Sequence, residues 1–173
     1  MKRAERGVAM GVWTARHVWN ALPVERRERV ALALWEDERL GRAERLAALQ
    51  PWLNAHGMRI AFLEQMPRVR RAALLARGGL PEETAQQALM SYHLVHQRPL
   101  LSRFLDLVGI PHKDGLIEDP DGVEAPSAEA VGKAVEAIRK EFPEEDVELY
   151  LRTLTAADSE MWRAVADAID GPQ

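Results

Sequence analysis

The sequence predicts an all-α protein: an irregular, partly orthogonal bundle of eight or nine short helices with one long loop at about residues 110–126. Apolar residues recur at helical spacing along most of the chain, and no stretch alternates steadily between apolar and polar residues. The 173 residues include 10 prolines and 11 glycines, which divide the pattern into segments too short for a long four-helix bundle. We expect one all-helical domain spanning residues 1–173.

The first two predicted helices lie on either side of Pro23. An apolar stripe predicts a helix over about residues 6–21. A second helix begins at Val24 and contains Val30–Trp35, which is apolar on every side and is therefore expected at the centre of the core. Gly41 is expected to end this second helix.

Three further helices are predicted before residue 78. One runs from Arg42 to His56, and Pro51 is expected to bend or split it because proline lacks the N–H that a helix interior needs. The segments Met58–Met66 and Pro67–Arg77 follow as two helices, and the second has proline at its favoured first position. Gly78-Gly79 is the expected stop.

The next helix is expected to begin at Pro81, with two glutamates in the first turn where the helix dipole favours acids. Pro99 predicts a kink or a new start. The most regular apolar face of the chain then extends from Leu100 to Val108 and ends at Gly109. The stretch from Pro111 to Pro126 has no helical pattern and is predicted to form the long loop.

Three more helix starts are expected after the loop. Ser127 is a candidate cap for the first of them, and Pro143 with the acids behind it begins the second. The last helix is expected to be capped by Asp158 or Thr155 and to end at Gly171.

Composition limits the class of protein. The chain has no cysteine, which excludes disulfides, thiolate metal sites and cysteine nucleophiles. No apolar run approaches the roughly 20 residues needed to span a bilayer, and the charged start lacks the apolar core of a signal peptide. We expect a soluble, cytoplasmic protein with no cofactor and no membrane partner.

Charge is divided unevenly along the chain. Residues 1–78 hold 15 Lys and Arg against 8 Asp and Glu, whereas residues 79–173 hold 8 against 19, so the halves carry +7 and −11. Such an asymmetry attracts an acidic partner to the front half, or it attracts the two halves to each other. Because both halves share one core in a domain of this size, we favour internal complementarity.

Three histidines and an aspartate are candidate metal ligands: His93, His96, His112 and Asp114. Histidines three residues apart share a helix face and can bind one metal ion, with a loop supplying further ligands. This predicts a metal-dependent or histidine-based enzyme with a site near His93, His96 and His112. The pattern is short and has no His-Glu-x-x-His motif beside it, and histidines flanking an apolar stripe are commonly structural.

The pairs Gly79-Leu80, Thr84-Ala85 and Ala88-Leu89 are spaced so that residues 73–89 resemble the turn and second helix of a repressor-type helix-turn-helix. The resemblance implies that the helix beginning at Pro81 reads DNA. A helix in the major groove brings arginine or lysine to phosphates and bases, but residues 79–97 contain neither. We therefore favour a plain helical hairpin.

Five arginines form a predicted basic surface: Arg59, Arg68, Arg70, Arg71 and Arg77. Guanidinium groups bind phosphates and carboxylates alike, so RNA, an acidic protein and the acidic half of the same chain are all candidate partners. Glutamates interleaved with the front-half arginines weaken any continuous track for nucleic acid.

These observations define no specific activity. The chain has no glycine-rich phosphate loop, no Gly-x-Ser-x-Gly and no dinucleotide fingerprint. The leading hypothesis is a non-enzymatic helical protein that binds another protein or itself. One alternative is the histidine-based or metal-dependent enzyme, and the other is nucleic-acid binding through the arginine-rich front half, which the charge pattern disfavours.

Overall fold

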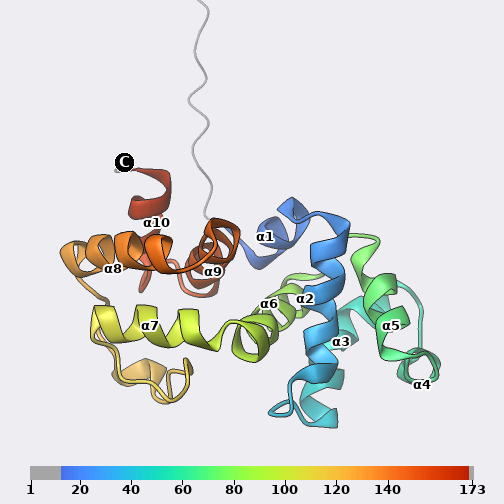
Figure 1. Ribbon diagram of the computed structural model, residues 1–173. Helices are drawn as coiled ribbons and strands as arrows, with labels where there is room; N and C mark the ends of the chain where they lie inside the picture. Colours follow the sequence, from blue (N-terminus) through green and yellow to red (C-terminus); the bar gives the residue numbers. More distant parts are fainter. Residues whose placement is uncertain (1–12, 172–173) are drawn as a thin grey trace, which may run out of the picture.

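A computed structural model describes residues 13–171, and this part of the chain forms ten α-helices, one 3₁₀ turn and no strand (Figure 1). The all-α prediction is confirmed, with one helix more than the expected maximum of nine. The helices are α1 (Ala15–Ala21), α2 (Val24–Glu36), α3 (Arg42–Ala55), α4 (Ile60–Glu64), α5 (Arg68–Ala76), α6 (Glu82–His96), α7 (Arg98–Val108), α8 (Ala128–Glu141), α9 (Glu144–Ala157) and α10 (Arg163–Asp170).

The start of α1 is fixed by two side chains. Thr14 Oγ1 accepts a hydrogen bond from the His17 N–H (3.2 Å), and the Glu82 carboxylate accepts from the N–H groups of Ala15 and Arg16 (2.8 and 3.0 Å). These bonds satisfy N–H groups that have no partner within a helix. Residues 13 and 14 are therefore not helical, and the part of the predicted helix at residues 6–12 lies outside the described residues.

The predictions for Pro51 and Pro99 have different outcomes. Pro51 does not split the segment that contains it, because α3 continues through it to Ala55. In the turn before Pro51, the Ala48 carbonyl accepts a hydrogen bond from Thr84 Oγ1 (2.6 Å), which ties α3 to α6. Pro99 lies in the first turn of α7, after a break at Gln97, so the predicted new start is confirmed.

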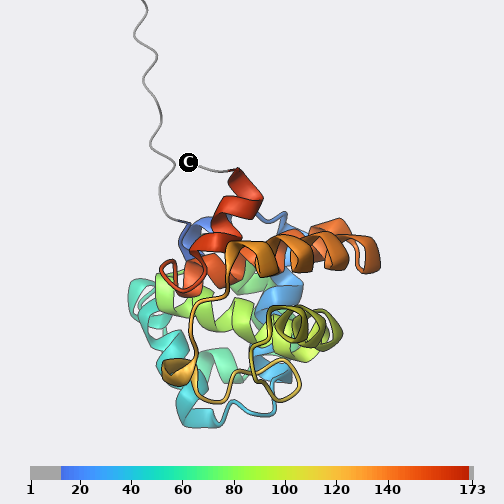
Figure 2. The same cartoon turned by 90° about the vertical axis from the view of Figure 1, so that its left-hand side faces the viewer.

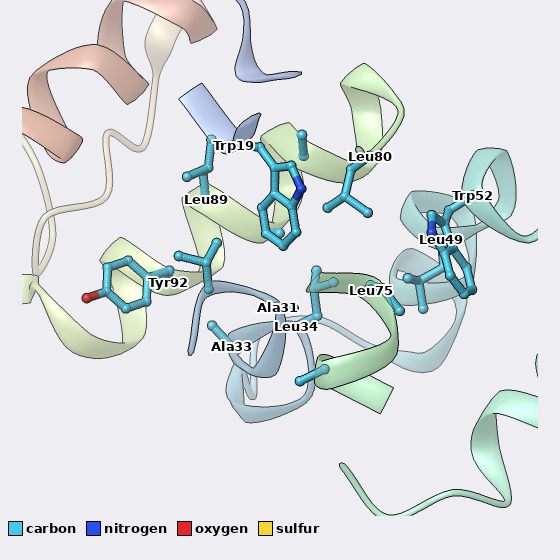
Figure 3. Close-up of a cluster of buried hydrophobic side chains, with 14 of the residues drawn as sticks. Trp19, Ala31, Ala33, Leu34, Leu49, Trp52, Leu75, Leu80, Leu89 and Tyr92 are labelled. Carbon is cyan, nitrogen blue, oxygen red and sulfur yellow. The ribbon is translucent and has the colours of Figure 1, made fainter. Parts of the chain in front are cut away.

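The buried apolar side chains form two clusters. The front cluster is built by α1 to α6 with Leu149 of α9, and its largest members surround Trp19 (Figure 3). The back cluster joins α7 to α10 with Leu94 of α6 and surrounds Phe104. Trp19 Nε1 donates to the Gly78 carbonyl (2.9 Å), so even the indole N–H at the centre of the front cluster has a partner.

Helix α6 lies at the centre of the molecule and contacts α1, α2, α3, α7 and α9 (Figure 1). Its residues Thr84, Ala85, Ala88 and Leu89, which carry the resemblance to a helix-turn-helix, are all buried. A recognition helix must expose the face that enters the groove. These four side chains lie in the core, and the preceding helix α5 packs chiefly against α2. DNA reading by α6 stays a prediction, which the absence of arginine and lysine from residues 79–97 disfavours.

The predicted long loop connects α7 to α8 and crosses one end of the molecule (Figure 2). It contains a single bridge between Lys113 and Leu116 and a 3₁₀ turn at Pro120–Gly122. Gly115 is buried against α7 with φ of 85°, and a Cβ there would lie 2.7 Å from the Leu101 Cβ. Glycine is therefore required at this close approach.

No helix in residues 13–171 combines the length and the apolar character needed to cross a membrane.

Candidate functional site

His93 is buried at the junction of the two clusters. It follows Tyr92 of the front cluster and precedes Leu94 of the back cluster, and its own ring is 1% exposed. Nε2 lies 3.0 Å from Thr153 Oγ1 on α9. Burial, together with the smaller effect of the nearby positive charge of Arg26, lowers the pKa of His93 to about 3. The side chain is therefore neutral at physiological pH.

Hydrogen bonds identify the tautomer of His93. The Thr153 hydroxyl has one proton, which it donates to the Leu149 carbonyl (2.7 Å). Thr153 Oγ1 must then accept from His93, so Nε2 carries the ring proton. Nδ1 is left as a bare lone pair with no hydrogen-bond partner among the described residues. The imidazole thus joins α6 to α9 and is closed to solvent.

His96 lies one turn further along α6 and faces outward. Its Nε2 is 2.7 Å from Glu36 Oε2, which bridges the ends of α6 and α2. Its ring is tilted against Tyr92, with 5.5 Å between ring centroids. His96 and Glu36 are both partly exposed, at 43% and 32% of their side-chain areas, so this pair is accessible to solutes.

His112 holds the long loop against α7. Nε2 lies 3.0 Å from Asp106 Oδ1, and Nδ1 accepts a hydrogen bond from the Gly115 N–H (3.1 Å). Asp114 is exposed and has φ of 50°, the left-handed conformation that aspartate tolerates in turns. Both ring nitrogens of His112 are therefore used to shape the loop.

The four predicted metal ligands do not converge. His93 bonds to α9, His96 bonds to α2 and His112 bonds to α7. Residues 13–171 contain no group of three or more histidine and carboxylate side chains placed to hold one metal ion. The described geometry gives the metal prediction no support, and His93 and His112 have structural contacts instead.

Several front-half arginines bind main-chain carbonyls. Arg27 donates to Trp19 and Asn20 at the end of α1, and Arg45 donates to Leu34 and Leu40 at and beyond the end of α2. Helix C-termini carry carbonyls without partners and the negative end of the helix dipole. These arginines thus stabilise the preceding helix ends.

Arg71 of the predicted basic surface belongs to the same class. It donates to the carbonyls of Glu64 and Met66 at and beyond the end of α4 (2.6 and 2.8 Å), and its guanidinium lies 5.6 Å from the Trp35 ring centroid. Arg71 is a half-buried residue of α5 that contacts the end of α4. The other four predicted residues are exposed: Arg59, Arg68, Arg70 and Arg77.

Within residues 13–171, one front-half arginine forms ion pairs with the acidic half. Arg26 of α2 pairs with Glu145 (2.8 Å) and Asp146 at the start of α9. Within the described residues, no other front-half arginine forms an ion pair with the acidic half. Direct pairing of front-half arginines with the acidic half is therefore confined to Arg26, and Arg27, Arg45 and Arg71 bind main-chain carbonyls instead.

Three exposed arginines, Arg59, Arg68 and Arg70, lie on or next to α4 and α5, the two helices that carry the exposed apolar side chains Phe62 and Val69. We define the α4–α5 surface as Arg59, Phe62, Arg68, Val69 and Arg70. Phe62 is 53% exposed and Val69 is 70% exposed, two of the four large apolar side chains so exposed in residues 13–171. None of the three arginines forms an ion pair in that range.

Helices α4 and α5 lie at one edge of the molecule (Figure 1). An open hollow of about 420 Å³ adjoins the α4–α5 surface and is lined by His56, Gly57, Met58, Arg59 and Phe62. Sequence reasoning identified the arginines but not Phe62 and Val69. Local sequence gives no signal for their exposure, since apolar residues next to arginines are also buried in this chain, as Val30 beside Arg29 is.

No family model matches the chain, and no curated protein or solved structure shows a significant match to it.

Proposed function

We propose that this protein is a non-enzymatic helical binding protein and that its α4–α5 surface docks an acidic segment of another protein. The observation that carries the proposal is the combination of Phe62 and Val69 with three arginines that have no carboxylate partner in the described residues. Single exposed apolar side chains are common on protein surfaces. Groups of exposed apolar side chains are typical of interaction sites. The surrounding arginines select a partner with negative charge.

The chemistry of the surface favours protein over nucleic acid. Nucleic-acid affinity comes from many phosphate contacts along a cationic track. Arg42, Arg45 and Arg71, which would extend such a track, are engaged with Glu64 or with main-chain carbonyls. A short arginine group around Phe62 and Val69 fits a segment that carries acids and one or two large apolar side chains, the latter entering the hollow beside Phe62.

The test is site-specific photocrosslinking in cells from position 69, followed by identification of the crosslinked peptide. We expect an acidic peptide with apolar anchors. Arg70→Glu should reduce its yield at least tenfold, because repulsion replaces an attractive contact in a desolvated interface. Arg163→Glu on α10 is the matched control, since it makes the same charge change at an exposed arginine outside the surface, and it should leave the yield unchanged.

Three results would overturn the proposal. Equal crosslinking in Arg70→Glu and wild type would show that the surface does not select the partner. Salt-sensitive binding of a 20-nucleotide RNA or DNA that Arg70→Glu weakens would assign the surface to nucleic acid. Concentration-dependent dimers that Arg70→Glu dissolves would make a second copy of the chain the occupant.

A further inference from the structure

A groove between α2 and α6 lies apart from the α4–α5 surface and has about 230 Å³ of space, lined by Arg29, Leu32, Glu36, Tyr92 and His96. On α2 the three lining residues are separated by three and four positions, which places them along one face. On α6, Tyr92 and His96 are also four apart. Two packed helix faces thus present both polar and apolar groups to one space.

The charged side chains of the groove differ in whether they already have an ion-pair partner. The Glu36 carboxylate already has a partner in His96 Nε2, at 2.7 Å. Arg29 is exposed, and no carboxylate in residues 13–171 lies within ion-pair distance of it. The cation that remains available to an incoming anion is therefore the Arg29 guanidinium, whose planar donors suit a carboxylate.

The apolar walls of the groove are Leu32 and the ring of Tyr92. Tyr92 is only 7% exposed and packs at the edge of the front cluster, where its hydroxyl points away from the labelled leucines (Figure 3). This hydroxyl is a second donor at the border of the apolar wall. The space is smaller than the roughly 300–1,000 Å³ usual for drug-sized ligands, so it suits a small molecule.

We propose that the α2–α6 groove binds a small carboxylate with an apolar body. The carboxylate pairs with Arg29, and the apolar body packs on Leu32 and the Tyr92 ring. A dianion such as phosphate fits less well, because it would meet the Glu36 carboxylate and would leave the apolar wall uncovered. The site is independent of the proposed protein-binding surface and would stand if that proposal failed.

The experiment is a titration of the full chain followed by ¹H–¹⁵N and methyl NMR, with benzoate as the probe. We expect saturable shifts at Leu32 and Tyr92 with a Kd of about 1 mM, which corresponds to about 4 kcal/mol. Benzamide keeps the ring and loses the charge, and inorganic phosphate keeps the charge and loses the ring. Both should bind at least tenfold more weakly than benzoate.

Substitutions in the groove test which residues bind the benzoate carboxylate. Arg29→Gln should weaken benzoate binding at least tenfold, and Tyr92→Phe should weaken it several-fold. Arg77→Gln, a change at an exposed arginine outside the groove, should leave the Kd unchanged, and each spectrum reports whether the variant is folded. Absence of saturable shifts at 20 mM benzoate, equal binding of phosphate, or an unchanged Kd in Arg29→Gln would overturn the proposal.

Discussion

Main-chain carbonyls are more frequent partners of basic side chains in the front half than in the back half, within the described residues. In the front half, Arg27, Arg45 and Arg71 donate to main-chain carbonyls at or beyond the ends of α1, α2 and α4. In the back half, Lys133 and Lys140 pair with glutamates one turn earlier on α8. Arg98, which donates to the Leu94 carbonyl at the end of α6, is a back-half arginine that follows the front-half pattern.

This contrast explains why counting charges misjudged the relation between the halves. A guanidinium that binds peptide carbonyls needs no acidic residue, because the C-terminal end of a helix supplies the negative potential. The front half therefore carries an excess of positive charge without an equal number of carboxylate partners elsewhere. Of the front-half arginines, Arg26 alone meets the acidic half through ion pairs in the described residues.

The largest effect is expected from removing the centre of the front cluster. Trp19→Ala deletes a fully buried side chain and its hydrogen bond to Gly78, and it should lower the free energy of unfolding by about 3–5 kcal/mol. Urea denaturation monitored by circular dichroism measures this. Because α6 and α9 contribute to both clusters, we expect a single transition. Two separate transitions in the circular dichroism would show that the two regions fold independently.

The next-largest effect is the pH dependence of stability caused by His93, which lies at the junction between the two clusters. The folded-state pKa of His93, about 3, lies below the ordinary value of 6.5, so the unfolded chain binds a proton at this residue before the folded chain does. Stability is fully present above pH 6.5 and is lost as the pH falls toward 3. The contribution is about 1.4 kcal/mol per pH unit in that window.

His93→Leu isolates this contribution, since every other titrating group is common to the two proteins. The fall in the free energy of unfolding between pH 7 and pH 5 should be about 2 kcal/mol smaller in His93→Leu than in wild type. Urea titrations at the two pH values give the difference. Equal falls in both proteins would mean that the imidazole is hydrated and titrates normally.

The smallest effects compare the two uses of basic side chains directly. Arg45→Met keeps an apolar stem and removes the donors to the Leu34 and Leu40 carbonyls, which should cost about 1–3 kcal/mol. Lys133→Met removes an exposed pair with Glu129 one turn away, which should cost less than about 0.5 kcal/mol. The same denaturation assay ranks them, and an equal cost for the two variants would contradict the distinction between the halves.

Much of the fold could be predicted from local sequence. Helix periodicity, the serine cap before α8 and the proline at the start of α7 act through neighbouring residues, and the structure has each of them. Of the two outcomes expected at Pro51, the split is wrong, because α3 continues through the proline to Ala55. The extent of α1 also depends on distant residues, since Glu82 helps to fix its start.

The candidate site was harder to predict for the same reason. A spacing of three residues does place His93 and His96 on one helix, yet it says nothing of what packs on that helix. Thr153 and Glu36, each 60 positions away, decide that one imidazole is buried and the other is accessible. The Arg29 groove likewise exists only because α2 packs against α6.

The anchoring of α1 has a consequence for the order of folding. Trp19 bonds to Gly78, Ala15 bonds to Glu82, and the helix also packs against α9, which ends at Ala157. A ribosome makes α1 before α6 and α9, so the complete binding site of α1 exists only after α9 has emerged. Contacts so distant in sequence form late because closing the long loop costs entropy. We therefore expect α1, with Trp19, to acquire its full set of contacts only once α6 and then α9 have been synthesised.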